Sequence, residues 1–306
     1  NQPEVFNLAK ELRALVQKYR PDRMLIGEVF GSDENQKRFL GEKQEGLNLI
    51  FLWELLNLKT TAAFLRKVIQ HYEQNYPVPY TPVYVFGNHD RKRLISQCGG
   101  DLRIAKLLAL FQFTVRGVPV TYYGEEIGMA EVSMSAKTAL DPVGRKYAWV
   151  PSILADMLGL YVNRDGCRTP MQWEASPNAG FCPVSATPWL PVHENHNVIN
   201  VQDQSADQDS LLNLYRTLLR LRQEMPSLQT GSLELIGDPN IDQHTLAYTR
   251  SVEDQTLLVV LNFGVTETVF QNPTDCQQIL LRTGQVTTAG PSQILLPPFS
   301  WVLLSN

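Results

Sequence analysis

The chain has 306 residues, 43% of them hydrophobic, a net charge of -4 and a pI near 5.8. That length and apolar content support a sizeable core in one large or two ordinary domains. The acidic balance and the lack of any run of Lys and Arg argue against nucleic acid and anionic membrane as the main partner. No stretch approaches the roughly 18 uninterrupted apolar residues of a membrane span.

Cysteine usage indicates the compartment. The four cysteines stand far apart and include no C-x-x-C pair: Cys98, Cys167, Cys182 and Cys276. This spacing predicts neither a zinc cluster nor a dense disulfide framework, and free thiols favour a reducing, cytoplasmic location. We expect no metal and no cofactor. Because Asn1 opens the chain without a Met or a signal-peptide pattern, we expect that a segment was removed before it or that the sequence begins within a gene.

The first part of the chain alternates helix and strand patterns. Apolar residues at helical spacing follow Pro3 and predict an amphipathic helix: Val5, Leu8, Leu12, Leu15 and Val16. Further helix patterns occupy residues 60–72 and 102–113, and short apolar runs occupy residues 24–30, 47–56, 83–86 and 118–124. Asp101 is the expected N-cap of the helix at 102–113. This alternation predicts a parallel sheet with helical crossovers.

Two of the strand patterns end in polar residues. Glu28 interrupts the run at 24–30, where it fits either an ion-paired structural carboxylate or a carboxyl whose pKa is raised by partly apolar surroundings. Asn88, His89 and Asp90 follow the strand at 83–86, at the carboxyl end where parallel α/β folds build active sites. The same tripeptide also fits a polar turn with Asp90 as the N-cap of a helix.

Regular periodicity fails between Glu125 and Gln208. This stretch contains three of the five tryptophans, Trp149, Trp173 and Trp189. A connection of this length without periodicity is more often an active-site wall or lid than filler.

Regularity returns with a helix predicted at residues 211–224, capped at Asp209 and Ser210. From Gly231 onward, short alternating runs separated by turn residues predict a small antiparallel β-domain, a sandwich. The expected strands are residues 245–250, 256–263, 266–270, 278–282, 293–296 and 301–304. We expect this domain to serve packing.

Carboxylates at the ends of the predicted strands indicate which reaction the fold could catalyse. Carboxylates that converge from several strand ends fit a TIM-type barrel that runs a two-carboxyl glycosidase reaction. The sequence IGEVF around Glu28, VFGNHD around Asp90 and the run TYYGEEIGM resemble three motifs of the α-amylase family of glycoside hydrolases. Three ordered motifs agree by chance far less often than one.

The resemblance extends over nearly the whole chain. NRDGCRTPMQW at residues 163–173, AGF at 179–181, PWLPV at 188–192 and the helix SLLNLYRTLLRLRQEMPSL are similar to α-glucosidases and oligo-1,6-glucosidases of that family. The fold class that it implies is α/β, namely the C-terminal half of a TIM (β/α)8 barrel followed by a small antiparallel β-sandwich. The implied domains are residues 1–227, with barrel strands five to eight and a long loop at about 125–208, and residues 228–306.

The resemblance also implies roles for individual residues. Glu28 matches the general acid/base, which protonates the glycosidic oxygen and then activates water. Asp90 matches the carboxylate that grips sugar hydroxyls and stabilises the oxocarbenium-like transition state, and His89 matches a hydrogen-bond donor to the same ring. Arg93 fits the NHD-x-x-R pattern of an arginine near the non-reducing-end glucose. Judged from the residues alone, His89 also fits a satisfied core histidine and Arg93 a solvated cation at a helix start.

The chain departs from the family pattern at the nucleophile. Family members attack with an Asp in a motif that resembles GFRxD, and neither this Asp nor its nearby Arg is present. Asp22 is the only aspartate ahead of Glu28, and it precedes its strand. The alternation also starts with a helix and shows about four strands where a barrel needs eight. We therefore expect these 306 residues by themselves to be inactive and prone to aggregate, and the parent protein to be a retaining α-glucosidase.

The segment at residues 146–163 is a second departure, which fits a lid insertion or a gene-model artefact. Two other functional classes stay open for the parent protein. One is a transglycosylating relative of the trehalose synthase or sucrose isomerase type; the other is a non-catalytic ectodomain like the heavy chains of amino-acid transporters. Retention of Glu28, Asp90 and Arg93 disfavours the ectodomain. The expected partner is an oligosaccharide or disaccharide substrate, with no nucleic acid and no membrane.

Overall fold

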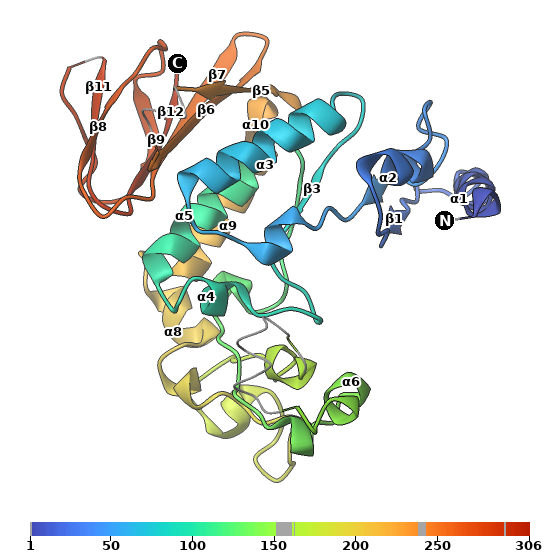
Figure 1. Cartoon of the computed structure of the whole chain (residues 1–306). Coiled ribbons are helices and arrows are strands. Elements are labelled where there is room, and N and C mark those ends of the chain that lie inside the picture. Colours follow the sequence, from blue (N-terminus) through green and yellow to red (C-terminus); the bar gives the residue numbers. More distant parts are fainter. Residues whose placement is uncertain (1, 151–160, 162, 238–242, 291) are drawn as a thin grey trace.

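A computed structural model describes residues 2–150, 161, 163–237, 243–290 and 292–306 (Figure 1). The α-helices are α1 (Pro3–Val16), α2 (Asp33–Leu40), α3 (Ala62–Asn75), α4 (Leu94–Gln97), α5 (Leu102–Thr114), α6 (Pro142–Lys146), α8 (Val201–Ala206), α9 (Leu211–Glu224) and α10 (Pro226–Thr230). The 3-10 helices are η1 (Glu54–Asn57), η2 (Glu125–Ile127), η3 (Ala136–Thr138), η4 (Arg164–Cys167), η5 (Pro177–Gly180) and η6 (Glu194–Asn197). The strands are β1 (Ile26–Gly27), β2 (Leu49–Ile50), β3 (Val83–Val85), β4 (Val118–Val120), β5 (Ser232–Ile236), β6 (Thr245–Val252), β7 (Gln255–Asn262), β8 (Thr268–Gln271), β9 (Gln278–Arg282), β10 (Thr287–Thr288), β11 (Gln293–Leu296) and β12 (Trp301–Ser305).

The four short strands of the first part are parallel, as the alternation predicts. β1 pairs with β2 and β3 pairs with β4, and helices connect the members of each pair. Among the described residues no backbone pairing joins β2 to β3, so two separate pairs are present. In Figure 1, β1 lies with α1 and α2 to one side of β3. The half-barrel arrangement therefore remains a prediction.

Local capping explains where the longer helices begin. Asp101 accepts a hydrogen bond from the backbone N–H of Arg103 at the start of α5, as predicted. Ser210 does the same for Asn213 at the start of α9, and Pro226 follows its end. These caps satisfy N–H groups that the first turn of a helix leaves free.

Helix α1 forms as predicted, but its apolar stripe faces solvent. Its buried residues are Phe6 and Ala9, and the Phe6 ring packs edge-on against Phe39 of α2 with centroids 4.7 Å apart. The stripe is exposed by 40 to 52% at Val5, Leu8, Leu12 and Leu15. An amphipathic helix normally buries such a stripe; here no described element covers it.

The β-domain consists of two antiparallel sheets, with strand orders β5-β6-β7-β12-β9 and β10-β11-β8. All six predicted strands are present to within a few residues; β5 and β10 were not predicted. One face of the five-stranded sheet packs on the three-stranded sheet through alternate residues such as Leu258, Val260 and Phe270, which is the packing of a sandwich.

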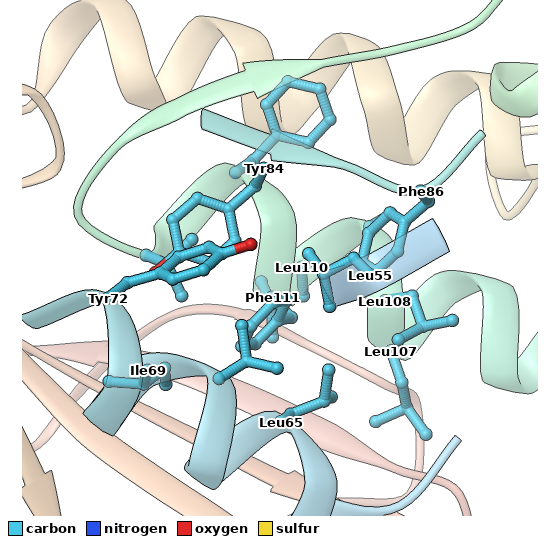
Figure 2. Close-up of a cluster of buried hydrophobic side chains, with 14 of the residues drawn as sticks. Leu55, Leu65, Ile69, Tyr72, Tyr84, Phe86, Leu107, Leu108, Leu110 and Phe111 are labelled. Carbon is cyan, nitrogen blue, oxygen red and sulfur yellow. The ribbon is translucent and has the colours of Figure 1, made fainter. Parts of the chain in front are cut away.

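The other face of the five-stranded sheet shares a core with the helices. Tyr248 and Val259 belong to the same buried cluster as residues of α3, α5 and α9. Figure 2 shows the part of this cluster where Leu65, Tyr84 and Phe111 meet. The predicted boundary between residues 227 and 228 falls within α10, so no linker separates the two parts.

A buried arginine ties the sheet to the helices. Arg250 of β6 donates to the carbonyls of Thr114 at 2.6 Å and Gly231 at 2.9 Å, and it has no exposed surface. The Tyr248 and Thr114 hydroxyls lie 2.6 Å apart in the same region. These contacts satisfy polar groups that would otherwise be buried without partners.

The long stretch after β4 is built from short elements. Among the described residues of 125–208 no helix exceeds six residues. Most of the unusual segment at 146–163 lies outside the described residues.

All four cysteines are free thiols, as predicted. No described helix has the length and apolar character needed to cross a bilayer.

Candidate active site

Asp90 is held in place directly after β3. Its backbone N–H donates to Asn88 Oδ1 at 2.9 Å, which forms the predicted polar turn. Its Oδ1 accepts hydrogen bonds from Arg164 Nη1 at 2.7 Å and Arg168 Nη2 at 2.8 Å. No described residue donates a hydrogen bond to Oδ2, and the side chain is 35% exposed. One carboxylate oxygen is thus oriented by protein and the other faces outward. Asp90 does not cap a helix, because the N-cap of α4 is Arg93.

Arg164 is itself fixed by a second carboxylate. Its Nη2 donates to Asp141 Oδ1 at 2.6 Å and its Nε to Asp141 Oδ2 at 2.8 Å, a bidentate pair. Asp141 has no exposed side-chain surface. The hydrogen bond from Arg164 holds the pKa of Asp141 well below its usual range, and the same bond raises the pKa of Arg164. The guanidinium therefore stays charged and bridges the two carboxylates.

His89 stands beside Asp90 with its ring in solvent. Its side chain is 61% exposed, and its Nε2 lies 3.6 Å from Asp90 Oδ1. Its backbone carbonyl accepts a hydrogen bond from Arg168 Nε at 2.7 Å. The core-histidine alternative is therefore wrong, and Arg168 fixes both His89 and Asp90.

Glu28 follows β1 and is exposed. Its carboxylate forms no ion pair or hydrogen bond with the described residues, so the structural ion pair considered for it is absent from this part of the chain. The next residue is anchored: Val29 is buried, and its carbonyl accepts from Trp53 Nε1 at 2.9 Å. Glu28 and Asp90 follow strands that belong to different pairs.

Arg93 lies in the interior, with 1% of its surface exposed. Its Nη1 donates to the carbonyl of Tyr123 at 2.7 Å, and its guanidinium lies over the Tyr122 and Tyr123 rings at 5.3 and 4.7 Å. As the chain folds here, Arg93 has almost no surface to offer a sugar, and it is not the solvated cation of the alternative interpretation. Its hydrogen bond reaches the turn after β4.

A buried carboxyl accompanies Arg93. Burial raises the pKa of Glu125 well above its ordinary value of 4.5, although the nearby Arg93 charge opposes the shift. Neither carboxyl oxygen of Glu125 has a hydrogen-bond partner among the described residues. A Cβ on Gly87 would lie 2.7 Å from Glu125 Oε1, so glycine at the end of the β3 strand lets this carboxyl approach the backbone before Asp90.

One other group of side chains has metal-ligand types. Asp33, Glu54 and His71 each place one ligand atom within 4.8 Å of the others. The His71 Nε2 lies 3.3 Å from Asp33 and 3.5 Å from Glu54, and the Tyr76 and Tyr72 hydroxyls donate to these two carboxylates. Proton donors already surround both carboxylates, so the cluster holds together as a polar contact between α2, η1 and α3.

The sequence did not identify Arg164, Arg168 or Asp141 as site residues. Both arginines lie in the NRDGCRTPMQW run that carries the family resemblance, and this was the available signal. Their partner Asp90 lies 74 and 78 residues earlier. Hydrophobic periodicity indicates only which residues share a face of one helix or strand. A contact between residues more than seventy positions apart is therefore seen only in the three-dimensional structure.

The arrangement suits a sugar better than an anion. Asp90 presents an outward oxygen that can accept from a hydroxyl, and His89 presents an exposed ring nitrogen that can donate to one. The two arginines are occupied by carboxylates. A neutral polyhydroxy ligand fits this pattern of donors and acceptors.

Known proteins are similar to this chain in sequence and in fold. Residues 1–231 match the family model described as alpha amylase, catalytic domain. An oligo-1,6-glucosidase of Heyndrickxia coagulans is 28% identical over 97% of this chain and 57% of its own length. A probable oligo-1,6-glucosidase of Bacillus subtilis (strain 168) is 32% identical over 83% of this chain and 49% of its own length.

Solved structures agree with these relatives. A trehalulose synthase superposes with a TM-score of 0.87 at 27% identity over 100% of this chain and 60% of its own. An isomaltulose synthase from Erwinia rhapontici NX5, solved with its natural substrate sucrose, gives 0.86 at 27% identity over 100% and 59%. The chain thus spans between about half and three fifths of the length of these four proteins. It belongs to the α-amylase family of glycoside hydrolases, whose catalytic domain is a TIM barrel.

Proposed function

We propose that this chain supplies the acid/base side of a retaining α-glucosidase site that acts on short oligosaccharides. Glu28 protonates the glycosidic oxygen as the bond breaks and then removes a proton from the incoming water. Asp90 accepts hydrogen bonds from hydroxyls of the ring that becomes oxocarbenium-like, and His89 donates to that ring. The attacking carboxylate is assigned to no residue of this chain.

The observation that supports the proposal most strongly is the state of Asp90. Two arginines hold one oxygen, the other is unpaired among the described residues, and an exposed His lies alongside. A carboxylate preorganised in this way binds a hydroxyl with little loss of side-chain entropy. The similarity to oligo-1,6-glucosidases supports the reaction class.

The proposal also covers the role of Arg93 and the division of the chain into domains. We assign Arg93 a positioning role through Tyr123 rather than a contact with glucose. We assign residues 1–227 to part of the catalytic barrel and residues 228–306 to the β-sandwich. The cytoplasmic location inferred from the free thiols is part of the proposal.

Glu28→Gln in the complete protein tests the acid/base assignment. The amide cannot donate or accept the catalytic proton, so we expect kcat on isomaltose or p-nitrophenyl α-glucoside to fall by roughly 10²–10⁴-fold. Glu42→Gln is the matched control, because Glu42 is also exposed and forms no described contact; it should leave kcat unchanged. Near-normal turnover of the Glu28 variant would exclude it from this role.

A second candidate is an isomerising transglycosylase that uses the same residues. It is favoured by the neighbouring solved structures, which are trehalulose and isomaltulose synthases. The two differ in whether water or a sugar hydroxyl resolves the covalent intermediate. Product analysis on sucrose, isomaltose, maltose and trehalose separates them: free glucose from isomaltose indicates hydrolysis, and an isomer of sucrose indicates transglycosylation.

A further inference from the structure

The backbone around Glu28 is held on both sides, although its side chain is exposed. On one side, the carbonyl of Gly27 accepts the backbone N–H of Phe51 at 3.0 Å, beside the β1–β2 pairing. On the other side, Val29 is buried and its carbonyl is hydrogen-bonded. The carboxylate of Glu28 forms no hydrogen bond or ion pair with the described residues. Its position is therefore set by the backbone that carries it.

A buried amide supplies part of this hold. Gln36 of α2 is 5% exposed, and its Nε2 donates to the carbonyl of Val29 at 3.3 Å. Trp53 Nε1 donates to the same carbonyl at 2.9 Å, so both lone pairs of this oxygen are occupied. The Oε1 of the amide accepts the Tyr76 hydroxyl at 2.6 Å. Gln36 thus links the residue after Glu28 to Tyr76.

Tyr76 joins this link to the pair of strands that ends at Asp90. It is the C-cap residue of α3 and is 1% exposed. Its ring meets the Tyr72 ring edge-on with centroids 6.3 Å apart, and Tyr72 meets Tyr84 of β3 edge-on at 5.0 Å. Figure 2 shows the Tyr72 and Tyr84 rings together. Because no backbone pairing joins β2 to β3 among the described residues, side chains such as these connect the two pairs.

A second buried amide braces the other strand pair. Gln112 of α5 is 1% exposed, and its Nε2 donates to the carbonyls of Tyr84 at 3.1 Å and Val120 at 3.0 Å. It holds β3 and β4 from a helix, as Gln36 holds the end of β1. Its loss should therefore disturb the strands that lead to Asp90 and leave the backbone of Glu28 in place.

We propose that Gln36 is a positioning residue for Glu28, with Tyr76 holding its amide in place; this rests on the proposed function. The amide fixes the carbonyl next to Glu28, and the backbone in turn fixes the direction in which the carboxylate leaves the strand. A general acid must lie within hydrogen-bond reach of the glycosidic oxygen, about 2.6–3.2 Å. A displacement of about 1 Å can cost a hundredfold in rate. Gln36 touches no substrate and acts through the backbone.

The leaving group separates the positioning of an acid from a general loss of structure. The sugar alcohol leaves isomaltose when the C–O bond breaks and the glycosidic oxygen receives a proton from Glu28. Fluoride leaves α-glucosyl fluoride as the anion when the C–F bond breaks, without that proton. The value of kcat/KM covers the steps up to departure of the leaving group. It therefore depends strongly on the acid for isomaltose and little for the fluoride.

Gln36→Met in the complete protein tests the proposal, because methionine keeps the length of the side chain and removes both hydrogen bonds. We expect kcat/KM on isomaltose to fall roughly 10- to 100-fold and kcat/KM on α-glucosyl fluoride to fall less than about threefold. Tyr76→Phe removes one hydroxyl and should act in the same direction by a smaller factor. Gln112→Met is the matched control and should lower both values by the same factor.

Hydrogen–deuterium exchange in the 306-residue chain gives a readout that needs no turnover. Exchange of the peptide that contains Glu28 should speed up several-fold in Gln36→Met and stay unchanged in Gln112→Met. Unchanged exchange in a folded Gln36→Met variant would show that the amide does not hold this backbone.

Glu28→Gln on the same two substrates distinguishes failure of this proposal from failure of the proposed function. Selective loss on isomaltose in Glu28→Gln, with no selective loss in Gln36→Met and Tyr76→Phe, overturns the role of Gln36 and keeps Glu28 as the acid. Equal losses on both substrates in Glu28→Gln overturn the acid assignment and the role of Gln36 with it. Circular dichroism checks that each variant is folded, and Tyr76→Phe decides by the same comparison if Gln36→Met is not.

Discussion

At the scale of single residues, the site is organised by charges that alternate through Asp90, Arg164 and Asp141. Asp141 has no exposed side-chain surface and depends on Arg164 for its charge balance. Asp90 is partly exposed and offers an oxygen outward. Removing one partner of a buried pair is costly because the other charge is left unpaired. The buried carboxylate thus supports the arginine, and the arginine orients the carboxylate that we assign to sugar binding.

The lowered pKa of Asp141 predicts a specific loss of stability in acid. A carboxylate whose folded pKa lies below its unfolded value of 3.8 stabilises the fold above that pH and loses this contribution as the pH falls below it. Asp141→Asn should cost about 1.5–3 kcal/mol of unfolding free energy at pH 7, a difference that shrinks between pH 4 and pH 2. Urea denaturation across this range measures it. Asp22→Asn, at an exposed pair, should show little difference at any pH.

Glu125 predicts the opposite dependence. Its folded pKa is raised, so the folded state binds the proton more tightly and loses stability as the pH rises above about 4.5. Glu125→Gln removes this effect, so wild type should lose stability relative to the variant as the pH rises above about 4.5. Glu42→Gln serves as the exposed control. A constant difference would mean that Arg93 keeps Glu125 charged at every pH.

At the scale of whole elements, α1 and the five-stranded sheet behave differently. The sheet is anchored to the helices in two ways. Arg250 donates to the carbonyls of Thr114 in α5 and of Gly231 directly after α10, and Tyr248 lies in the shared core. Helix α1 touches α2 through Phe6 and leaves its apolar stripe in solvent. Burial of such a stripe provides most of the stability of a surface helix. The stripe is therefore an exposed apolar surface of α1.

Charged substitutions on the α1 stripe test this. In the isolated chain, Leu8→Lys with Leu12→Lys should change the unfolding free energy by less than about 0.5 kcal/mol, because both positions are solvent-exposed. Light scattering on warming should fall, since an exposed apolar patch promotes association. Phe6→Lys is the contrasting variant, as Phe6 is buried against Phe39, and it should release α1. Strong destabilisation by the double variant would show that the stripe is covered in solution.

At the scale of the whole molecule, the chain holds only some of the groups that we propose for the reaction. It spans about half of the curated relatives it matches, its parallel strands form two separate pairs, and Glu28 and Asp90 lie on different pairs. A two-carboxyl mechanism needs an attacking group on the opposite side of the sugar from the acid, and none is assigned here.

The 306 residues alone should therefore fail to hydrolyse p-nitrophenyl α-glucoside. The expected rate is indistinguishable from the buffer blank, because a missing nucleophile leaves only acid catalysis and binding. Turnover by the purified, monomeric chain, abolished by Glu28→Gln, would contradict the assignment of the nucleophile outside these residues. Sugar binding without turnover would support it.

Much of the local structure was predictable. The caps of α5 and α9, the strand at β3 and the sandwich strands follow from propensity and period, which are short-range properties. The burial of Arg93 and the exposure of the α1 stripe were not predicted, because burial depends on which elements lie across from a residue. The contacts of Arg164 and Arg168 with Asp90 were not predicted for the same reason.

The sequence by itself determined the family, the order of most of the longer helices and strands, and the placement of Glu28 and of His89 with Asp90 after strands, because motifs and local periodicity carry this information. Tertiary structure alone decided that two arginines more than seventy residues away orient Asp90, that Arg93 is buried beneath the turn after β4, and that Gln36 donates a hydrogen bond to the backbone next to Glu28. The physical reason is that electrostatic pairing and desolvation act through space, between groups that the chain brings together only when it folds.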